Sequence, residues 1–200
     1  MSTRVSIQAT KVTFPNQFTS MAASLFVPPN VEKTKKCRAL AIAHPFGGVK
    51  EQTAGIYARK MAEKGYVTLA FDASHQGESG GYPRDTENPA ERIEDIRCAV
   101  DYLTTLPIVD EDRIGLLGIC AGGSDVMAVA PTEMCAKAIA SVSLWDLRVT
   151  AREGWPAPQY DRDQRSSGNR KATRCVGARS YGQAGRRHPE QGSGGRTRDQ

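Results

Sequence analysis

The turn at residues 118–123 is the sequence feature that most constrains how this chain can fold. Gly118-Ile119-Cys120-Ala121-Gly122-Gly123 follows directly on the apolar run Arg113-Ile114-Gly115-Leu116-Leu117. The pattern is typical of a strand that turns sharply into a helix and presents one reactive side chain at the turn. Strand and helix backbones pass close together there, so small residues are needed two positions before and after that side chain. Gly118 and Gly122 meet this need, which makes Cys120 the candidate nucleophile.

The environment of Cys120 can be interpreted in two ways. A helix that begins at Ala121 would direct its free N–H groups and the positive end of its dipole at Cys120, which favours the thiolate. Alternatively, the segment is a glycine-rich turn from strand to helix that holds a buried, unreactive cysteine.

A second signal lies upstream, at Ala41-Ile42-Ala43-His44-Pro45-Phe46-Gly47-Gly48. An apolar strand that ends in a His-Pro-x-Gly-Gly turn is where folds with such an elbow place half of an oxyanion hole. We expect the backbone N–H of Ala121 to be one donor and that of Phe46 or Gly47 to be the other. His44 precedes the elbow in the chain, so we interpret it as a residue that orients the loop.

Together these residues resemble the dienelactone hydrolase-like group of the α/β-hydrolase superfamily, whose elbow carries cysteine in a Gly-x-Cys-x-Gly-Gly setting. The segment from Phe71 to Gly80 also resembles the Asp-x-x-Gly-x-Gly-x-Ser loop that follows the fourth strand in many members, with His75-Gln76-Gly77 in place of the commoner Arg-Gly. The resemblance covers roughly residues 4–150. It implies hydrolysis of an ester or lactone of a small organic acid, without a cofactor.

Hydrophobic periodicity predicts the same architecture independently. Apolar runs predict strands at residues 4–14, 20–27, 38–43, 66–71, 114–117 and 136–144, and helical spacing predicts helices at 52–64, 89–103 and 121–130. Strands that alternate with helices indicate a parallel sheet covered on both faces. We therefore expect a three-layer α/β-hydrolase fold with a mostly parallel sheet that lacks its last strands.

The composition changes abruptly near residue 155. Residues 151–200 contain 11 basic and five acidic side chains, eight glycines and, of the Val/Ile/Leu/Met/Phe set, only Val176. Such a segment cannot bury enough apolar surface to offset the entropy of ordering it. We expect a partial hydrolase domain at 1–150 and a disordered Arg/Gly-rich tail at 151–200. The tail has few aromatic residues, which disfavours specific nucleic-acid binding.

The resemblance implies a triad carboxylate and histidine on later strands, and this chain offers poor candidates for them. Asp146 follows the last apolar run, His188 lies in the arginine-rich tail, and His75 lies in a loop. One hypothesis is a C-terminally truncated hydrolase whose residues after about Trp155 are read in a shifted frame. The strand at 136–144 would then be an unprotected sheet edge.

Cysteine usage favours a cytoplasmic protein with reduced thiols. The five cysteines are odd in number and include no Cys-x-x-Cys pair, so we expect neither a disulfide framework nor a zinc site. Cys98 fits the role of a small core residue. The N-terminus lacks the apolar core of a signal peptide, and no apolar run approaches transmembrane length.

Three functions are compatible with these observations. The first is a hydrolase in which Cys120 attacks the carbonyl of a small-molecule substrate while Phe46 and Ala121 hold the oxyanion, with no metal or cofactor. The second is a non-catalytic remnant or small-molecule-binding module. The third, a flavodoxin-like binder, is disfavoured because no phosphate-binding loop follows the first strands. The oligomeric state stays open.

Overall fold

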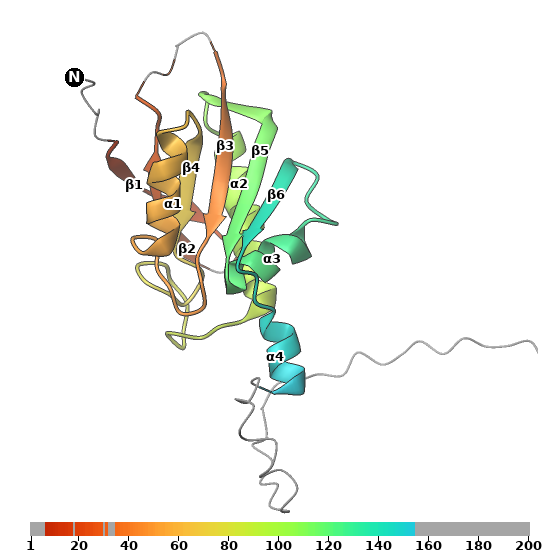
Figure 1. Cartoon of the computed structure of the whole chain (residues 1–200). Coiled ribbons are helices and arrows are strands. Elements are labelled where there is room, and N and C mark those ends of the chain that lie inside the picture. The colour runs from red at the N-terminus through yellow and green to blue at the C-terminus, as the bar shows by residue number, and fades with distance from the viewer. Residues whose placement is uncertain (1–6, 18, 30, 32–34, 155–200) are drawn as a thin grey trace, which may run out of the picture. The chain divides into compact units, whose positions relative to one another are not determined.

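The computed structural model describes residues 7–17, 19–29, 31 and 35–154. Within them one sheet has the strand order β1-β2-β4-β3-β5-β6 (Figure 1). The strands are β1 (Ala9–Pro15), β2 (Ser20–Phe26), β3 (Cys37–Ala43), β4 (Val67–Phe71), β5 (Val109–Ile119) and β6 (Ala136–Val142). The helices are α1 (Thr53–Ala62), α2 (Pro89–Thr104), α3 (Ala121–Val129) and α4 (Leu147–Glu153).

The sheet is mostly parallel, as the sequence predicts. Strands β4, β3, β5 and β6 run parallel to one another, whereas β1 and β2 form an antiparallel pair that joins the sheet through β4. Because β3 and β5 are parallel neighbours, with Ala43 opposite Gly118, the loops that leave these two strands start side by side. This register places the two predicted site segments at one edge of the sheet.

Helices cover both faces of the sheet, which confirms the three-layer arrangement (Figure 1). One apolar cluster joins the small residues Ala54, Ala58 and Ala62 of α1 to the face that carries Ile42 and Leu117. The other joins α2 and α3 to the opposite face, through Ile96, Val100, Val126, Val129, Leu69 and Leu116. Burial on both faces explains why the parallel strands are apolar without alternation.

The element boundaries differ from the sequence prediction in several places, among them the first strand, predicted from residue 4, which begins at Ala9. β5 begins at Val109 rather than near residue 114, and the short helix α4 was not expected. Asp146 begins α4, since its carboxylate accepts hydrogen bonds from the backbone N–H groups of Arg148 and Val149. This helix extends across residue 150, where the sequence predicted a domain boundary. The first residues of the predicted disordered tail, 151–153, are helical, and residues 155–200 lie outside the described ranges.

The outer edge of the sheet is exposed at β6, as expected. Four of its seven residues are exposed, namely Lys137, Ala138, Ala140 and Ser141. No strand in the described ranges pairs with the side of β6 that faces away from β5. None of the described helices is both long and apolar enough to cross a bilayer.

Candidate active site

Cys120 lies at the turn between β5 and α3 with an unusual backbone conformation. Its φ is 56° and its ψ is −116°, a combination that residues with a side chain rarely adopt. Strain of this kind persists only where the surrounding structure holds it, and it is concentrated at functional sites. The side chain is half-buried at the margin of the apolar cluster under α1. The sharp strand-to-helix turn predicted from the sequence is therefore present.

The glycines around Cys120 are required by contact with neighbouring backbone. A Cβ at Gly118 would lie 2.1 Å from the carbonyl oxygen of Gly122. A Cβ at Gly122 would lie 2.6 Å from the oxygen of Ala43 and 2.7 Å from that of His44. All three distances are well below van der Waals contact, and those at Gly122 show that the start of α3 packs directly against the end of β3.

Backbone hydrogen bonds from β6 and the segment after it hold the turn. The Cys120 N–H donates to the carbonyl oxygen of Val142 at 2.9 Å. The Cys120 carbonyl accepts from the N–H groups of Gly123 at 2.9 Å and Trp145 at 3.0 Å. The Cys120 backbone is thus held both by α3, through Gly123, and by β6 and the residues after it, through Val142 and Trp145.

The loop that leaves β3 supplies the second half of the predicted oxyanion hole. From the sequence, the second oxyanion donor could be the N–H of either Phe46 or Gly47. The N–H of Gly47 donates to Oε1 of Glu87 at 2.6 Å. The N–H of Phe46 and that of Ala121 have no acceptor within the described part of the chain. Between the two candidates in this loop, Phe46 is therefore the one whose N–H is not already bonded.

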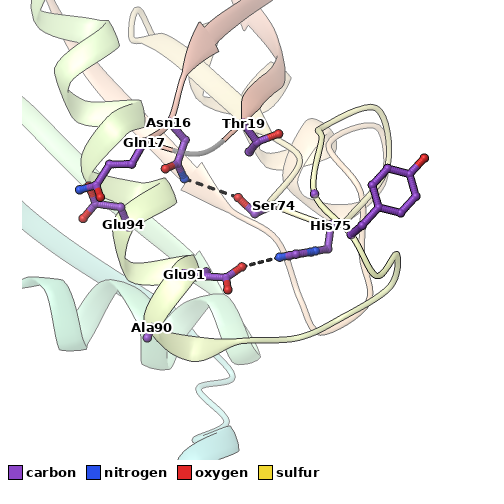
Figure 2. A pocket seen from close by; sticks show the side chains of 10 residues that line it. Asn16, Gln17, Thr19, Ser74, His75, Ala90, Glu91 and Glu94 are labelled. Carbon is purple, nitrogen blue, oxygen red and sulfur yellow. Dashed lines mark hydrogen bonds and ion pairs between the residues drawn. The ribbon is translucent and has the colours of Figure 1, made fainter.

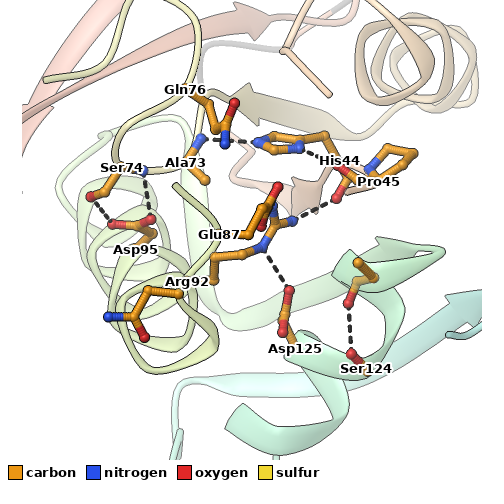
Figure 3. Close-up of polar contacts among 12 residues, drawn as sticks. His44, Pro45, Ala73, Ser74, Gln76, Glu87, Arg92, Asp95, Ser124 and Asp125 are labelled. Carbon is orange, nitrogen blue, oxygen red and sulfur yellow. Dashed lines mark hydrogen bonds and ion pairs between the residues drawn. The ribbon is translucent and has the colours of Figure 1, made fainter. Parts of the chain in front are cut away.

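His44 is buried and both of its ring nitrogens are bonded, in agreement with the structural role expected for it (Figure 3). The Ala73 N–H donates to Nε2 at 3.0 Å, so the ring proton is on Nδ1, which donates to the Pro45 oxygen at 2.7 Å. Burial, reinforced by the positive charge of Arg92, lowers the pKa of His44 to about 3. The ring is neutral near pH 7 and has no free nitrogen to act as a base.

A buried guanidinium joins the loop after β3 to the elbow helix. Arg92 of α2 donates from Nε to Asp125 of α3 at 2.7 Å and from Nη2 to the carbonyl oxygen of His44 at 2.6 Å. Its Nη1 donates to the carboxylate of Glu87, which also accepts the Gly47 N–H. Figure 3 shows Arg92 between His44, Glu87 and Asp125. One side chain thus sets the position of both segments that carry the predicted oxyanion donors.

Asp125 is fully buried, and burial raises its pKa even though the charge and hydrogen bond of Arg92 act in the opposite direction. Its Oδ2 faces Arg92, whereas its Oδ1 has no hydrogen-bond partner. We interpret Asp125 as the charge that keeps Arg92 in place.

This network was not predicted from the sequence, although the sequence contains two signals of it. Arg92 lies four residues before Ile96, on the face of α2 that carries its buried residues. Asp125 lies one helical turn after Ala121 in a helix whose described residues are otherwise almost entirely apolar or small. A charge on an apolar helix face predicts a buried ion pair.

The loop after β4 has a structural role in this chain. Asp72 is fully buried and accepts from the Lys50 ammonium at 2.7 Å and from the backbone N–H of Glu78 at 2.8 Å. Burial disfavours the charge on Lys50, but hydrogen bonds to Asp72, Glu78 and Glu51 outweigh it and raise the pKa of Lys50. Asp72 therefore closes the loop after β4 through the Glu78 N–H and ties it, through a buried ion pair with Lys50, to the segment before α1.

The candidates for a catalytic acid and base do not meet Cys120 in the described residues. His75 is bonded through Nε2 to Glu91 and through Nδ1 to the oxygen of Pro83. Asp146 caps α4, and hydrogen bonds from Arg148 outweigh burial and lower its pKa. No side chain in the described ranges hydrogen-bonds to the Cys120 sulfur. His188 lies outside those ranges.

No group of three or more His, Cys, Asp or Glu side chains within the described part of the chain could hold a metal ion. Four described cysteines, Cys37, Cys98, Cys120 and Cys135, are free thiols. Burial, together with the charges of Glu94 and Asp101, raises the pKa of Cys98 to about 11. Cys98 packs against the core, as the sequence predicts.

The sequence model of the dienelactone hydrolase family matches residues 21–143, which include the β3 loop, the buried Asp72 and the elbow. The chain belongs to the dienelactone hydrolase family. The elbow and the loop after β3 both lie within the matched range, and the family is the one that the sequence resembles.

Relatives of this family member include longer proteins. It is 50% identical over 148 residues to the uncharacterized protein YcjY of Escherichia coli (strain K12), covering 72% of this chain and 48% of YcjY. The crystal structure of hypothetical protein PA2218 from Pseudomonas aeruginosa matches with a TM-score of 0.73 and 36% identity, covering 82% of this chain and 52% of that chain. The thiohydrolase aneE of Aspergillus aculeatus is 36% identical over 104 residues, covering 52% of this chain and 33% of aneE. The chain thus spans about half the length, or less, of these relatives.

Proposed function

We propose that this member of the dienelactone hydrolase family carries the acyl-accepting part of a hydrolase for esters or lactones of small organic acids. The observation that supports the proposal best is the strained backbone of Cys120, together with the N–H groups of Phe46 and Ala121, which have no acceptor in the described residues. The name of the thiohydrolase relative is in keeping with chemistry at an acyl carbonyl.

The proposed reaction has two steps. The Cys120 thiolate attacks the substrate carbonyl carbon, and the N–H groups of Phe46 and Ala121 donate to the oxyanion that forms. The C–O bond then breaks, the alcohol leaves with a proton from water, and a thioester on Cys120 remains. Water attacks this thioester and releases the acid and the thiol. Each oxyanion donor of this kind lowers a barrier by about 2.7–4 kcal/mol.

A second candidate function follows from one observation. No side chain in the described ranges is hydrogen-bonded to the Cys120 sulfur, whereas a nucleophile of this type is normally activated by an adjacent base. A protein that binds an acyl compound without turning it over is therefore the alternative.

Acetylation of the protein by p-nitrophenyl acetate tests the proposal. We expect wild-type protein to release about one equivalent of p-nitrophenol in a burst and to carry an acetyl group on the Cys120 peptide by mass spectrometry. Cys120→Ala removes the burst. Cys135→Ala is the matched control because Cys135 is an exposed free thiol in the loop before β6, outside the elbow, and we expect this variant to keep the burst.

Two results would decide against the proposal. Equal p-nitrophenol release by wild type and Cys120→Ala would remove Cys120 from the reaction. A protein that melts cooperatively but accepts no acetyl group on Cys120 would favour the binding function.

A further inference from the structure

The edge strand β6 and the segments beside it carry exposed apolar side chains that the proposed reaction does not use. Six large hydrophobic side chains are exposed within the described ranges, and three of them belong to this region. Met127 is in α3, Met134 lies just before β6, and Leu144 lies just after it. Single exposed apolar residues are normal, whereas a group of them beside an open sheet edge indicates an interaction surface.

The outer side of β6 presents backbone hydrogen-bonding groups with which no described strand pairs. The Val142 carbonyl points toward β5, since it accepts the Cys120 N–H at 2.9 Å. Because the backbone groups of successive strand residues point to opposite sides, those of Ile139 and Ser141 point away from β5. A row of donors and acceptors of this kind is a template for the addition of another strand.

The other edge strand, β1, is better protected against strand addition. It contains a lysine, Lys11, and it ends at Pro15, which has no backbone N–H. The turn that follows is fastened to the loop after β4 by Asn16, whose side-chain amide is bonded to Ser74 (Figure 2). β6 contains no proline, and its one charged residue is Lys137. Of the two edges, β6 is therefore the one suited to pair with another strand.

The sequence of β6 is complementary to itself when two copies run antiparallel. A two-fold axis places one residue opposite its own copy, and Ile139 is the midpoint of this seven-residue strand. The outward backbone groups of Ile139 would exchange two hydrogen bonds with those of the second Ile139. The same register places Lys137 opposite Ser141, so the one charge of the strand does not face itself. Beyond the strand, it brings Met134 of each copy toward Leu144 of the other.

We propose that β6 pairs with β6 of a second copy of this chain, so that one continuous sheet crosses a symmetric dimer. A two-fold axis perpendicular to the sheet keeps equivalent helices on the same face. Because α3 packs against β6 (Figure 1), the two α3 helices lie on either side of the axis with their exposed Met127 side chains. Burial of apolar side chains adds to the hydrogen bonds between the strands. This inference does not depend on the reaction at Cys120.

Two double variants of β6 test the surface and the register together. Ala138 and Ala140 are exposed, and each lies opposite the other across the proposed axis. Ala138→Lys with Ala140→Lys places like charges face to face, and we expect dimerisation to weaken by at least about tenfold. Ala138→Lys with Ala140→Glu is the matched control. It places opposite charges face to face, and we expect it to keep the dimer.

Sedimentation equilibrium of the full chain at a series of protein concentrations measures the association. We expect wild type to be a dimer that dissociates on dilution. A wild-type protein that stays monomeric would overturn the proposal, whether residues 155–200 cover the edge or nothing does. Equal dimerisation of the two double variants would place the interface elsewhere, and equal loss of the dimer in both would exclude the register.

A cysteine on the axis gives a second measurement that leaves the interface uncharged. In the Cys135→Ala background, Ile139→Cys would place two thiols on opposed residues about 5.5 Å apart between Cα atoms, a separation that a disulfide can span. We expect mild oxidation to link two copies through position 139. Ser141→Cys, which faces position 137 rather than its own copy, is expected to stay unlinked. Equal cross-linking of the two variants, or none in Ile139→Cys, would contradict the pairing.

Discussion

At the scale of single residues, Arg92 has the largest influence on the candidate active site. It is buried, and so are both of its acidic partners, Glu87 and Asp125. A buried ion pair adds little net stability, but removal of one partner leaves the other charge in a dry environment without compensation. Arg92 also holds the His44 carbonyl oxygen, and Glu87 holds the Gly47 N–H, so the pair sets the direction in which the Phe46 N–H can point.

Arg92→Ala is expected to lower the free energy of unfolding by about 3–5 kcal/mol, since it leaves two buried carboxylates unpaired. Urea denaturation measures this change. Arg97→Ala is the matched control in the same helix, because its pair with Glu94 is partly exposed, and we expect a loss of about 1 kcal/mol or less. If both variants lost a similar amount of unfolding free energy, burial of the Arg92 network would not be what makes its removal costly.

At the scale of elements, the elbow depends on the close packing of three backbones: those of β5, α3 and β3. Apolar runs predicted each of these elements, and the glycine spacing predicted the tight turn between β5 and α3. The sequence could not predict that β3 lies between β4 and β5, because strand order depends on contacts between distant segments. It also missed α4, since Leu147–Glu153 is too short for a clear helical period and Asp146 resembled a residue at the end of a strand.

Gly122→Ala tests the closeness of the β3–α3 contact. In an ordinary helix this change stabilises by roughly 0.5–1 kcal/mol. Here the added Cβ would meet the carbonyl oxygens of Ala43 and His44, which are backbone atoms and cannot rotate away. We therefore expect a loss of about 1–3 kcal/mol in thermal or urea unfolding, together with weaker acetylation of Cys120.

Gly123→Ala provides the comparison, because the nearest atom to its added Cβ is the Oγ of Ser141, a side chain that can be removed. Adding Ser141→Ala should recover much of the stability lost by Gly123→Ala. A stabilised Gly122→Ala would mean that the two elements are further apart than described.

At the scale of the whole molecule, buried ionisable groups link stability to pH. The pKa of His44 is about 3 in the folded protein and near 6.5 in an unfolded chain. Between these values the unfolded state binds more protons, so acid selectively favours unfolding. Asp95 and Asp125 act in the opposite direction, since burial raises the pKa of both carboxyls. The sequence suggested a structural role for His44, but burial and its neighbours become visible only in the fold.

The contribution of His44 can be isolated by substitution. Between pH 7 and pH 5 we expect wild type to lose about 2 kcal/mol more unfolding free energy than His44→Gln, which can still accept the Ala73 N–H but cannot be protonated in this range. Urea titrations at the two pH values measure the difference. Parallel pH dependence of the two proteins would contradict the neutral, buried state of His44.

The two hydrogen bonds that the Cys120 backbone makes with Val142 and Trp145 have a consequence for biosynthesis. A ribosome must release the polypeptide to beyond Trp145 before these partners can dock. Until then the turn lacks the contacts that hold its left-handed conformation. The emerging polypeptide can therefore pair β3 with β4 and β5 before the backbone of Cys120 is locked.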